Sequence, residues 1–219
     1  MSPIRIALVD DHELVRRGVA AVLDAEEDME VAAQFSDADQ AVRELADLMP
    51  DVVLMDLRMP GTSGLKATAM LHQEAPDINV LVLTVSEQAQ DLQNALRFGA
   101  QGYVLKGASP EELVHAVRQV ADGWVIVSPA MAGKLLGEFP DGPIGDLADE
   151  GGPKASDDLS PREWDVLNHL SNGMSNREIA DSLVVSENTV KTHMRSILTK
   201  LHLKNRTQAA SYARQIERG

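Results

Sequence analysis

The sequence predicts two domains of different class: an α/β doubly wound domain with a five-stranded parallel sheet, and a small all-α domain containing a helix-turn-helix. Three observations lead to this prediction. Short apolar stretches alternate with amphipathic helical patterns through residues 1–122. A segment rich in Gly, Pro and acidic residues, 137–158, then interrupts the alternation and is typical of a flexible linker. After that segment, helical patterns follow one another without strand-like stretches between them.

The first domain is expected to consist of five βα units. Each strand-like stretch is short and mostly apolar, and the stretch after it repeats apolar residues at i, i+3 and i+4 on one helical face. Strands that alternate with helices in this way pair in parallel, with helices on both faces of the sheet. The expected strands are Ile4–Val9, Glu30–Phe35, Val52–Met55, Val80–Leu83 and Gly102–Leu105.

The second domain opens with a clear helix-start signal. Ser160 and Glu163 have the spacing of a capping box, and Pro161 occupies the first helical position. This signal predicts a helix to about Leu170. Small and apolar residues on the terminal helix are compatible with pairing to a second copy or with closing the core. The further expected helices are Asn176–Leu183, Glu187–Leu201 after the cap Ser186, and Thr207–Ile216.

Bulk composition limits the class of protein. The chain has 219 residues, of which 44% are hydrophobic, so two ordinary cores can form. No apolar run approaches the ~20 residues that span a bilayer, and the N-terminus lacks the layout of a signal peptide. Cysteine is absent, which excludes disulfides, thiolate metal sites and cysteine nucleophiles. These features predict a cytoplasmic protein without a membrane partner.

Charge is distributed unevenly along the chain. The net charge of −14 argues at first against a nucleic-acid partner. Residues 1–136 carry 10 Lys and Arg against 21 Asp and Glu, whereas residues 158–219 carry 9 against 7. Within the second group, residues 187–206 contain five basic residues and only one acidic residue, Glu187. An acidic first part and a locally basic tail indicate two domains with different partners.

Chemically active side chains follow four of the predicted strands. Asp10 and Asp11 follow the first strand, and Asp56 follows the third. Thr84 ends the fourth strand, and Lys106 follows the fifth. These residues should gather at one edge of the sheet, because the carboxyl ends of parallel strands meet there. Three neighbouring carboxylates require a cation, and hard oxygen ligands suit Mg²⁺. The set predicts a phosphoryl site with an aspartate nucleophile, where the metal and the lysine offset the phosphoryl charge.

Each of these residues also has an ordinary explanation when it is taken alone. An Asp-Asp pair is more often a solvated turn, and Thr84 or Lys106 alone would be a surface residue. Their joint occurrence at four strand ends favours the functional interpretation. Aspartyl-phosphate chemistry also occurs in haloacid-dehalogenase-like phosphatases, which need a second acid two residues after the nucleophile. Position 58 is arginine, which disfavours that class.

Four stretches of the first domain carry a family resemblance: "VDDH" (Val9–His12), "LMDLRMPG" (Leu54–Gly61), "LTVS" (Leu83–Ser86) and "GYVLKG" (Gly102–Gly107). Through them, residues 1–122 resemble the receiver domain of two-component response regulators, which has a flavodoxin-like fold. The resemblance implies that Asp56 is the phospho-acceptor. It implies that Lys106 and Thr84 contact the phosphoryl group and that Tyr103 switches rotamer together with Thr84. The implied Mg²⁺ ligands are Asp10, Asp11, Asp56 and the backbone carbonyl of Arg58.

The second domain carries its own resemblance in "SNREIA", "VSENTVKTHMRSILTKL" and "NRTQA". Through these stretches Leu159–Ala213 resembles the helix-turn-helix output domain of the LuxR, NarL and FixJ class. On the predicted helix Glu187–Leu201, a basic exposed face lies opposite the apolar residues and suits the major groove of DNA. The resemblance implies that Lys191, Thr192 and Arg195 meet base edges or nearby phosphates. The expected contacts to the DNA backbone are Asn176, Ser186, Thr189, His193, Lys200 and Arg206.

These expectations combine into one functional prediction. The chain resembles a response regulator in which a sensor histidine kinase phosphorylates Asp56 and thereby controls dimerisation and binding to double-stranded DNA. It is expected to promote its own phosphoryl transfer but not to be an enzyme for a separate substrate. The alternative is a receiver that acts as a protein-interaction module without phosphorylation. The expected boundaries are 1–122 for the receiver, 123–158 for a helical extension and flexible acidic linker, and 159–219 for the DNA-binding domain.

Overall fold

The computed structural model describes residues 3–128, 131–132, 159–203 and 205–216 of the chain. The chain divides into two compact units, Met1–Pro140 and Asp141–Gly219. The predicted flexible linker, 137–158, lies outside the described residues and stays a prediction. In the part of the chain that the structure describes, no helix is both long and apolar enough to cross a membrane.

The first unit contains one parallel sheet, and all five predicted strands are present in it. A sixth strand, β6, pairs in parallel with β5 inside the segment predicted as a helical extension. Strand β6 was not predicted, because a two-residue strand is too short to show an alternating pattern. The strands are β1 (Ile4–Val9), β2 (Met29–Phe35), β3 (Val52–Met55), β4 (Asn79–Thr84), β5 (Gly102–Leu105) and β6 (Ile126–Val127).

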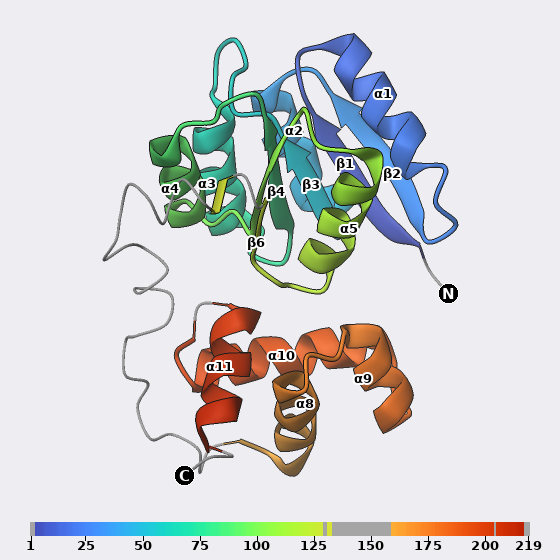
Figure 1. The fold of residues 1–219 in the computed structure, drawn as a ribbon, viewed down its shortest axis with the longest axis vertical. Coiled ribbons are helices and arrows are strands. Elements are labelled where there is room, and N and C mark those ends of the chain that lie inside the picture. Colours follow the sequence, from blue (N-terminus) through green and yellow to red (C-terminus); the bar gives the residue numbers. More distant parts are fainter. Residues whose placement is uncertain (1–2, 129–130, 133–158, 204, 217–219) are drawn as a thin grey trace. The chain divides into compact units, whose positions relative to one another are not determined.

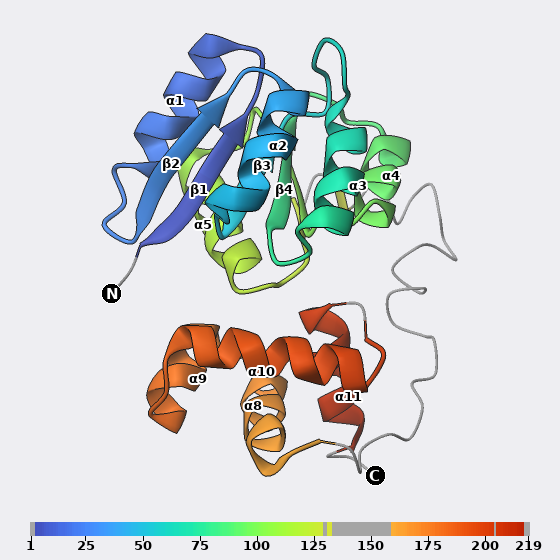
Figure 2. The same ribbon diagram turned by 180° about the vertical axis from the view of Figure 1, so that it is seen from behind.

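Helices cover both faces of this sheet (Figure 1, Figure 2). In β3, Val52 and Leu54 belong to the core under α1 and α5, whereas Val53 and Met55 belong to the core under α2 and α3. Successive strand residues point to opposite faces, so a strand covered on both sides is apolar at every position. The helices are α1 (Glu13–Leu23) and α5 (Pro110–Ala121) on one face, and α2 (Ala38–Leu48), α3 (Gly64–Glu74) and α4 (Ala89–Arg97) on the other.

The order of the strands determines where a site can form. The sheet runs β2-β1-β3-β4-β5-β6, so the direction of winding reverses between β1 and β3. At such a switch point the loops after the two strands diverge to opposite faces and leave a crevice at the carboxyl edge. The crevice therefore lies where β1 leads into Asp10 and β3 leads into Asp56.

The second unit consists of four helices within the described residues, and all four lie close to their predicted positions. Ser160, Ser175 and Ser186 cap the first three helices, because each side-chain oxygen accepts the backbone N–H of the residue three positions later. α10 packs on both α8 and α9, which places α9 and α10 as a helix-turn-helix (Figure 1). The helices are α8 (Pro161–Ser171), α9 (Asn176–Leu183), α10 (Glu187–Lys200) and α11 (Arg206–Ile216).

The small residues of α11 belong to the core of the second unit. Ala209, Ala210 and Ala213 are all buried, and α11 packs on α8. These three residues therefore close the core, which is one of the two alternatives that the sequence left open. Pairing of two copies through other residues of α11 stays a prediction.

Candidate functional site

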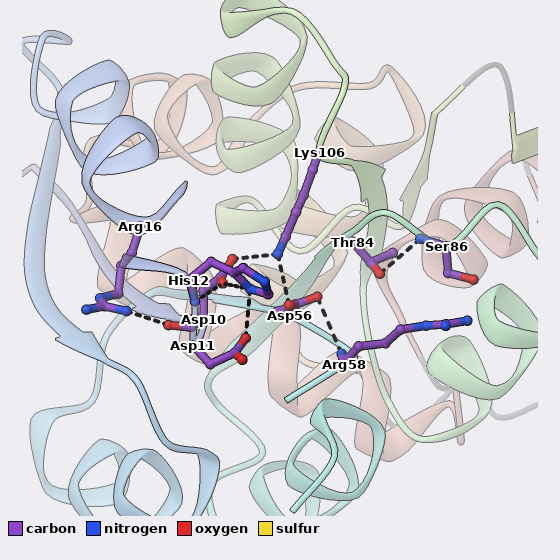
Figure 3. A network of polar contacts seen from close by, with 9 residues as sticks. All are labelled: Asp10, Asp11, His12, Arg16, Asp56, Arg58, Thr84, Ser86 and Lys106. Atoms are coloured by element: carbon purple, nitrogen blue, oxygen red, sulfur yellow. Dashed lines mark hydrogen bonds and ion pairs between the residues drawn. The ribbon is translucent and has the colours of Figure 1, made fainter. Parts of the chain in front are cut away.

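The predicted phosphoryl-site residues gather at the carboxyl edge of the sheet, around the switch point (Figure 3). The backbone pairing of the sheet continues into them. The backbone N–H of Asp56 donates to the carbonyl of Val9 at 2.9 Å, and that of Lys106 donates to the carbonyl of Thr84 at 2.8 Å. Each side chain is thus held by the strand ladder itself rather than by a free loop.

The Lys106 ammonium joins two buried aspartates (Figure 3). Its Nζ lies 2.8 Å from Asp10 Oδ2 and 2.8 Å from Asp56 Oδ2. Asp10 is 6% exposed and Asp56 is 3% exposed, so both carboxylates have lost most of their water. Burial by itself lowers the pKa of Lys106, but its hydrogen bonds to Asp10 and Asp56 outweigh burial and raise that pKa. Lys106 therefore carries a fixed positive charge at neutral pH.

The acidic side of this pocket fits a divalent cation. Asp10, Asp11, Asp56 and His12 each offer a ligand atom, and these atoms lie within 4.8 Å of one another. Asp11 Oδ1 is buried and accepts no hydrogen bond in the described part of the chain, although His12 Nδ1 lies 2.9 Å away. Three carboxylates face one ammonium, so negative charge remains uncompensated. Oxygen donors of this kind suit Mg²⁺.

A close backbone approach holds the loop after Asp56. A Cβ atom at Gly64 would lie 1.9 Å from the Asp56 carbonyl oxygen, so only glycine fits at the start of α3. The backbone N–H of Gly64 donates to the Leu57 carbonyl at 3.1 Å. The backbone N–H of Arg58 lies 3.4 Å from Asp56 Oδ1, to which it donates. These contacts fix the position of Arg58, whose carbonyl as a metal ligand stays a prediction.

Thr84 and Tyr103 are linked through Ser86. Thr84 Oγ1 accepts the backbone N–H of Ser86 at 3.2 Å, and the Tyr103 hydroxyl donates to the Ser86 carbonyl at 3.0 Å. Both side chains are fully buried, and burial raises the pKa of Tyr103 to about 12. The Ser86 hydroxyl donates to Asp91 at 2.5 Å, and Asp91 lies 3.7 Å from the Arg58 guanidinium. Sequence reasoning missed Ser86 and Asp91, since no local pattern brings α4 beside the end of β4.

The predicted DNA-reading face lies on α10 of the second unit. Thr192 and Arg195 are exposed and Lys191 is half-buried. On the other side of the helix, Val190 and Ile197 are fully buried. The helix is therefore amphipathic, with basic residues on its outer face. Of the predicted contacts to the DNA backbone, Ser186 and Thr189 lie at the start of α10, and His193 is half-buried on it.

The burial of Arg206 and Asn176 contradicts their predicted role as contacts to DNA phosphates. Arg206 is 1% exposed and donates to Asn176 Oδ1 and to the Met174 carbonyl. Asn176 is 3% exposed. A phosphate contact needs an exposed polar atom, whereas these side chains join the start of α9 to the start of α11 inside the unit. The prediction rested on the family resemblance, which does not give the burial of an individual side chain.

Lys200 also has an internal partner. Its Nζ lies 2.8 Å from Glu163 Oε2, and the Glu163 side chain is only 5% exposed. From the sequence, Glu163 was predicted to be a capping residue of α8 and Lys200 to be a contact to the DNA backbone. The structure brings the two together across 37 residues of sequence.

Comparison with known proteins agrees with this arrangement. Residues 6–118 match the response regulator receiver domain, and residues 157–213 match the bacterial regulatory proteins of the luxR family. The chain is a response regulator of this family. The response regulator is thus a phosphorylation-controlled, DNA-binding transcription regulator, and the alternative of a receiver that acts without phosphorylation is not favoured.

Relatives match this response regulator over both units. The transcriptional regulatory protein LnrK of Bacillus subtilis is 36% identical over 211 residues, which is 96% of each chain. The oxygen regulatory protein NreC of Staphylococcus aureus is 38% identical over 211 residues, again 96% of each chain. Among solved structures, the response regulator ChrA of a heme-sensing two-component system covers 99% of both chains, at 35% identity and a TM-score of 0.55.

Proposed function

We propose that Asp56 is the phospho-acceptor of this response regulator and that a sensor histidine kinase supplies the phosphoryl group. The observation that carries the proposal is the buried Asp56 carboxylate, 2.8 Å from the Lys106 ammonium at the switch point of the sheet. In the transfer, an Asp56 oxygen attacks phosphorus, and the phosphorus–nitrogen bond of the donor phosphohistidine breaks as the new phosphorus–oxygen bond forms. Lys106 offsets charge on the incoming phosphoryl oxygens.

The proposed Mg²⁺ ligands are Asp10, Asp11, Asp56 and the backbone carbonyl of Arg58. When bound, Mg²⁺ would neutralise phosphoryl oxygens during transfer. The buried Oδ1 of Asp11 supports this assignment, because among the described residues it accepts no hydrogen bond and its neighbour is the His12 ring nitrogen, 2.9 Å away. Lys106 keeps Asp10 and Asp56 in place from the opposite side of the pocket.

Thr84 and Tyr103 would report phosphorylation to the surface of the receiver. The Thr84 hydroxyl would leave the backbone N–H of Ser86 and bind the phosphoryl group. Because the Tyr103 hydroxyl is bonded to the carbonyl of the same Ser86, displacement of that residue would change the Tyr103 rotamer as well. The altered surface would favour a homodimer when the protein is phosphorylated or bound to DNA.

α10 is the proposed reading helix for double-stranded DNA in the cytoplasm. Lys191, Thr192 and Arg195 would contact base edges or nearby phosphates in the major groove. Ser186, Thr189 and His193 would contact the DNA backbone from the same side. In this proposal residues 1–122 receive the signal, residues 159–219 bind DNA, and residues 123–158 connect them.

The phospho-acceptor is tested by intact-mass measurement after incubation with acetyl phosphate and Mg²⁺. The wild type should gain one phosphoryl group, and Asp56→Asn should gain none, because an amide is not a nucleophile. Asp51→Asn is the matched control. Asp51 directly precedes the first residue of β3, and its Oδ2 accepts the backbone N–H of Arg5 at 3.0 Å. Asparagine at position 51 keeps an oxygen that can accept this N–H. Full labelling of Asp56→Asn would overturn the assignment.

The reading helix is tested on a DNA duplex that the wild type selects from a random-sequence pool. Lys191→Ala and Arg195→Ala should each weaken binding by about 1–3 kcal/mol if they contact bases. Arg162→Ala removes an exposed basic residue of α8 in the same unit and should leave binding close to wild type. If both α10 variants bind as wild type while their helical circular dichroism is intact, α10 is not the reading helix.

A further inference from the structure

Glu163 has more hydrogen-bond partners than a capping residue needs. The backbone N–H of Ser160 donates to Oε2 at 2.6 Å, which completes the capping box of α8. Two donors come from α10 in addition. The Ser196 hydroxyl donates to Oε1 at 2.5 Å, and the Lys200 ammonium lies 3.0 Å from Oε1 and 2.8 Å from Oε2. The carboxylate therefore connects the start of α8 to the last turns of α10.

A second capping box in the same unit shows that these extra contacts are not part of the motif. Glu178 occupies the same position in α9 and is exposed. Its carboxylate accepts the backbone N–H of Ser175 at 2.7 Å and the Ser175 hydroxyl at 2.9 Å. Both donors belong to its own cap, so a capping box forms without any partner from α10.

The Glu163 contacts have consequences for the orientation of α10. Ser196 and Lys200 are four residues apart and therefore lie on one face of the helix. Their shared carboxylate restrains rotation of α10 about its axis, because rotation would draw one donor away from a buried, ionised acceptor. Arg195 is adjacent to Ser196 in the same turn. Base contacts depend on groove geometry, so a rotated helix would misplace Arg195 even with every reading side chain present.

The charge on the Glu163 carboxylate is already paired inside the second unit. Burial raises the pKa of Glu163, but the hydrogen bonds from Lys200, Ser196 and Ser160 outweigh burial and lower that pKa to about 2. The carboxylate is therefore ionised at neutral pH and faces the Lys200 ammonium. Moving Lys200 to a DNA phosphate would leave a buried carboxylate without its cation, which is costly.

We propose that Glu163 is a positioning residue for DNA recognition, which orients the reading helix through Ser196 and Lys200. Lys200 serves this contact and does not neutralise a DNA phosphate. The inference rests on the proposed role of α10 in reading DNA. It assigns to a residue outside α10 an effect on sequence discrimination.

Two measurements on the full chain separate a positioning role from a phosphate contact. The first is the slope of log affinity against log salt, which changes by about 0.9 for each DNA phosphate that the protein no longer neutralises. The second is the ratio of affinities for the selected duplex and a scrambled duplex of equal length. Removing a cation from a DNA phosphate weakens binding to both duplexes about equally, whereas a misplaced reading helix lowers the ratio. All proteins are first incubated with acetyl phosphate and Mg²⁺.

The variants are Lys200→Met, Glu163→Gln and the double variant, with Lys191→Met to calibrate the removal of a cation at the DNA. Lys200→Met should keep the wild-type slope and lower the affinity ratio several-fold. The double variant should recover part of that ratio, because removing both charges leaves no buried ion unpaired. Glu178→Gln, the matched capping-box control, should leave both quantities unchanged. Circular dichroism checks folding, and Lys200→Met alone tests the proposal if Glu163→Gln does not fold.

The outcomes are distinct. A fall in slope for Lys200→Met as large as that for Lys191→Met would show that Lys200 contacts a phosphate. That result would overturn the inference and leave the proposed function in place. An unchanged affinity ratio for both Lys200→Met and Glu163→Gln would overturn it as well. A wild type that selects no duplex would contradict the proposed function, and the inference would fail with it.

Discussion

Among the residues that the structure describes, each unit of this response regulator has a lysine against buried carboxylate oxygens, and the two groups differ in how many hydrogen-bond donors those oxygens have. Lys106 Nζ lies 2.8 Å from Asp56, and Lys200 Nζ lies 2.8 Å from Glu163. In the first unit one ammonium contacts two aspartates, and the neighbouring Asp11 Oδ1 accepts no hydrogen bond among the described residues, with the His12 ring nitrogen 2.9 Å away. In the second unit one carboxylate receives an ammonium, a hydroxyl and a backbone N–H.

This difference distinguishes a reactive pocket from a structural contact. Oxygens that already accept several hydrogen bonds gain little from a cation, whereas crowded carboxylates that share few donors favour one. A short carboxylate–lysine distance therefore does not identify a site by itself. The balance between donors and acceptors around the carboxylate does.

The largest effect is expected from removing Lys106, the lysine whose carboxylate partners have few other donors. Lys106→Met leaves Asp10 and Asp56 buried as like charges, so the free energy of unfolding of the first unit should fall by about 3–5 kcal/mol. Urea unfolding followed by Trp124 fluorescence in a Trp164→Phe background isolates this unit, because the chain has 2 tryptophans, one in each unit. Lys66→Met, at an exposed position of α3, is the control. A destabilisation no larger than that of the control would contradict the role of Lys106.

The contact between Glu163 and Lys200 should make the stability of the second unit depend on pH in the acid range. The pKa of Glu163 falls from 4.5 to about 2 on folding: burial raises it, and the Lys200, Ser196 and Ser160 hydrogen bonds outweigh burial. Because the folded-state pKa is depressed, the stabilisation is fully present above about pH 4.5 and is lost as pH falls toward about 2. Its size is about 3 kcal/mol at most.

This pH dependence is measured as the difference in unfolding free energy between wild type and Glu163→Gln. Trp164 fluorescence in a Trp124→Phe background reports the second unit, and the difference should shrink between about pH 6 and about pH 2. Glu178→Gln should show the same sign with a smaller change, because hydrogen bonds from the Ser175 backbone and side chain lower the pKa of exposed Glu178. A difference that is constant over this range would show that Glu163 gains no stabilisation from its charge.

The smallest expected effect is stabilisation by Mg²⁺, which should differ between the two units. Mg²⁺ at about ten times its dissociation constant should stabilise the first unit by about 1.4 kcal/mol. The same addition should leave the second unit unchanged, because the Glu163 oxygens are occupied. Asp11→Asn should remove most of the Mg²⁺ effect, and Asp39→Asn, at an exposed position in the first turn of α2, should retain it. Equal stabilisation of both units by Mg²⁺ would contradict the distinction.

Much of the first unit could be predicted because its signals are local. The continuous apolar stretch Val52–Met55 indicated a strand buried on both faces, and the structure covers it on both faces. Residues at the carboxyl ends of parallel strands must share an edge, so Asp10, Asp56 and Lys106 could be placed together before any coordinates. Neither Ser86 nor Asp91 could be joined to that group, because their contact depends on how α4 docks after the β4 turn.

The two capping boxes of the second unit separate what sequence and tertiary structure each decide. Ser160 with Glu163 and Ser175 with Glu178 have the same spacing, and both pairs form a capping box, of which the first was predicted. The sequence by itself determined these helix starts, because a capping box needs only side-chain and backbone atoms within one turn of the same helix. Only the tertiary structure decided that Glu163 is buried against Lys200 while Glu178 stays exposed. The physical reason is that burial depends on which helix packs over the carboxylate, and that partner lies 37 residues away in sequence.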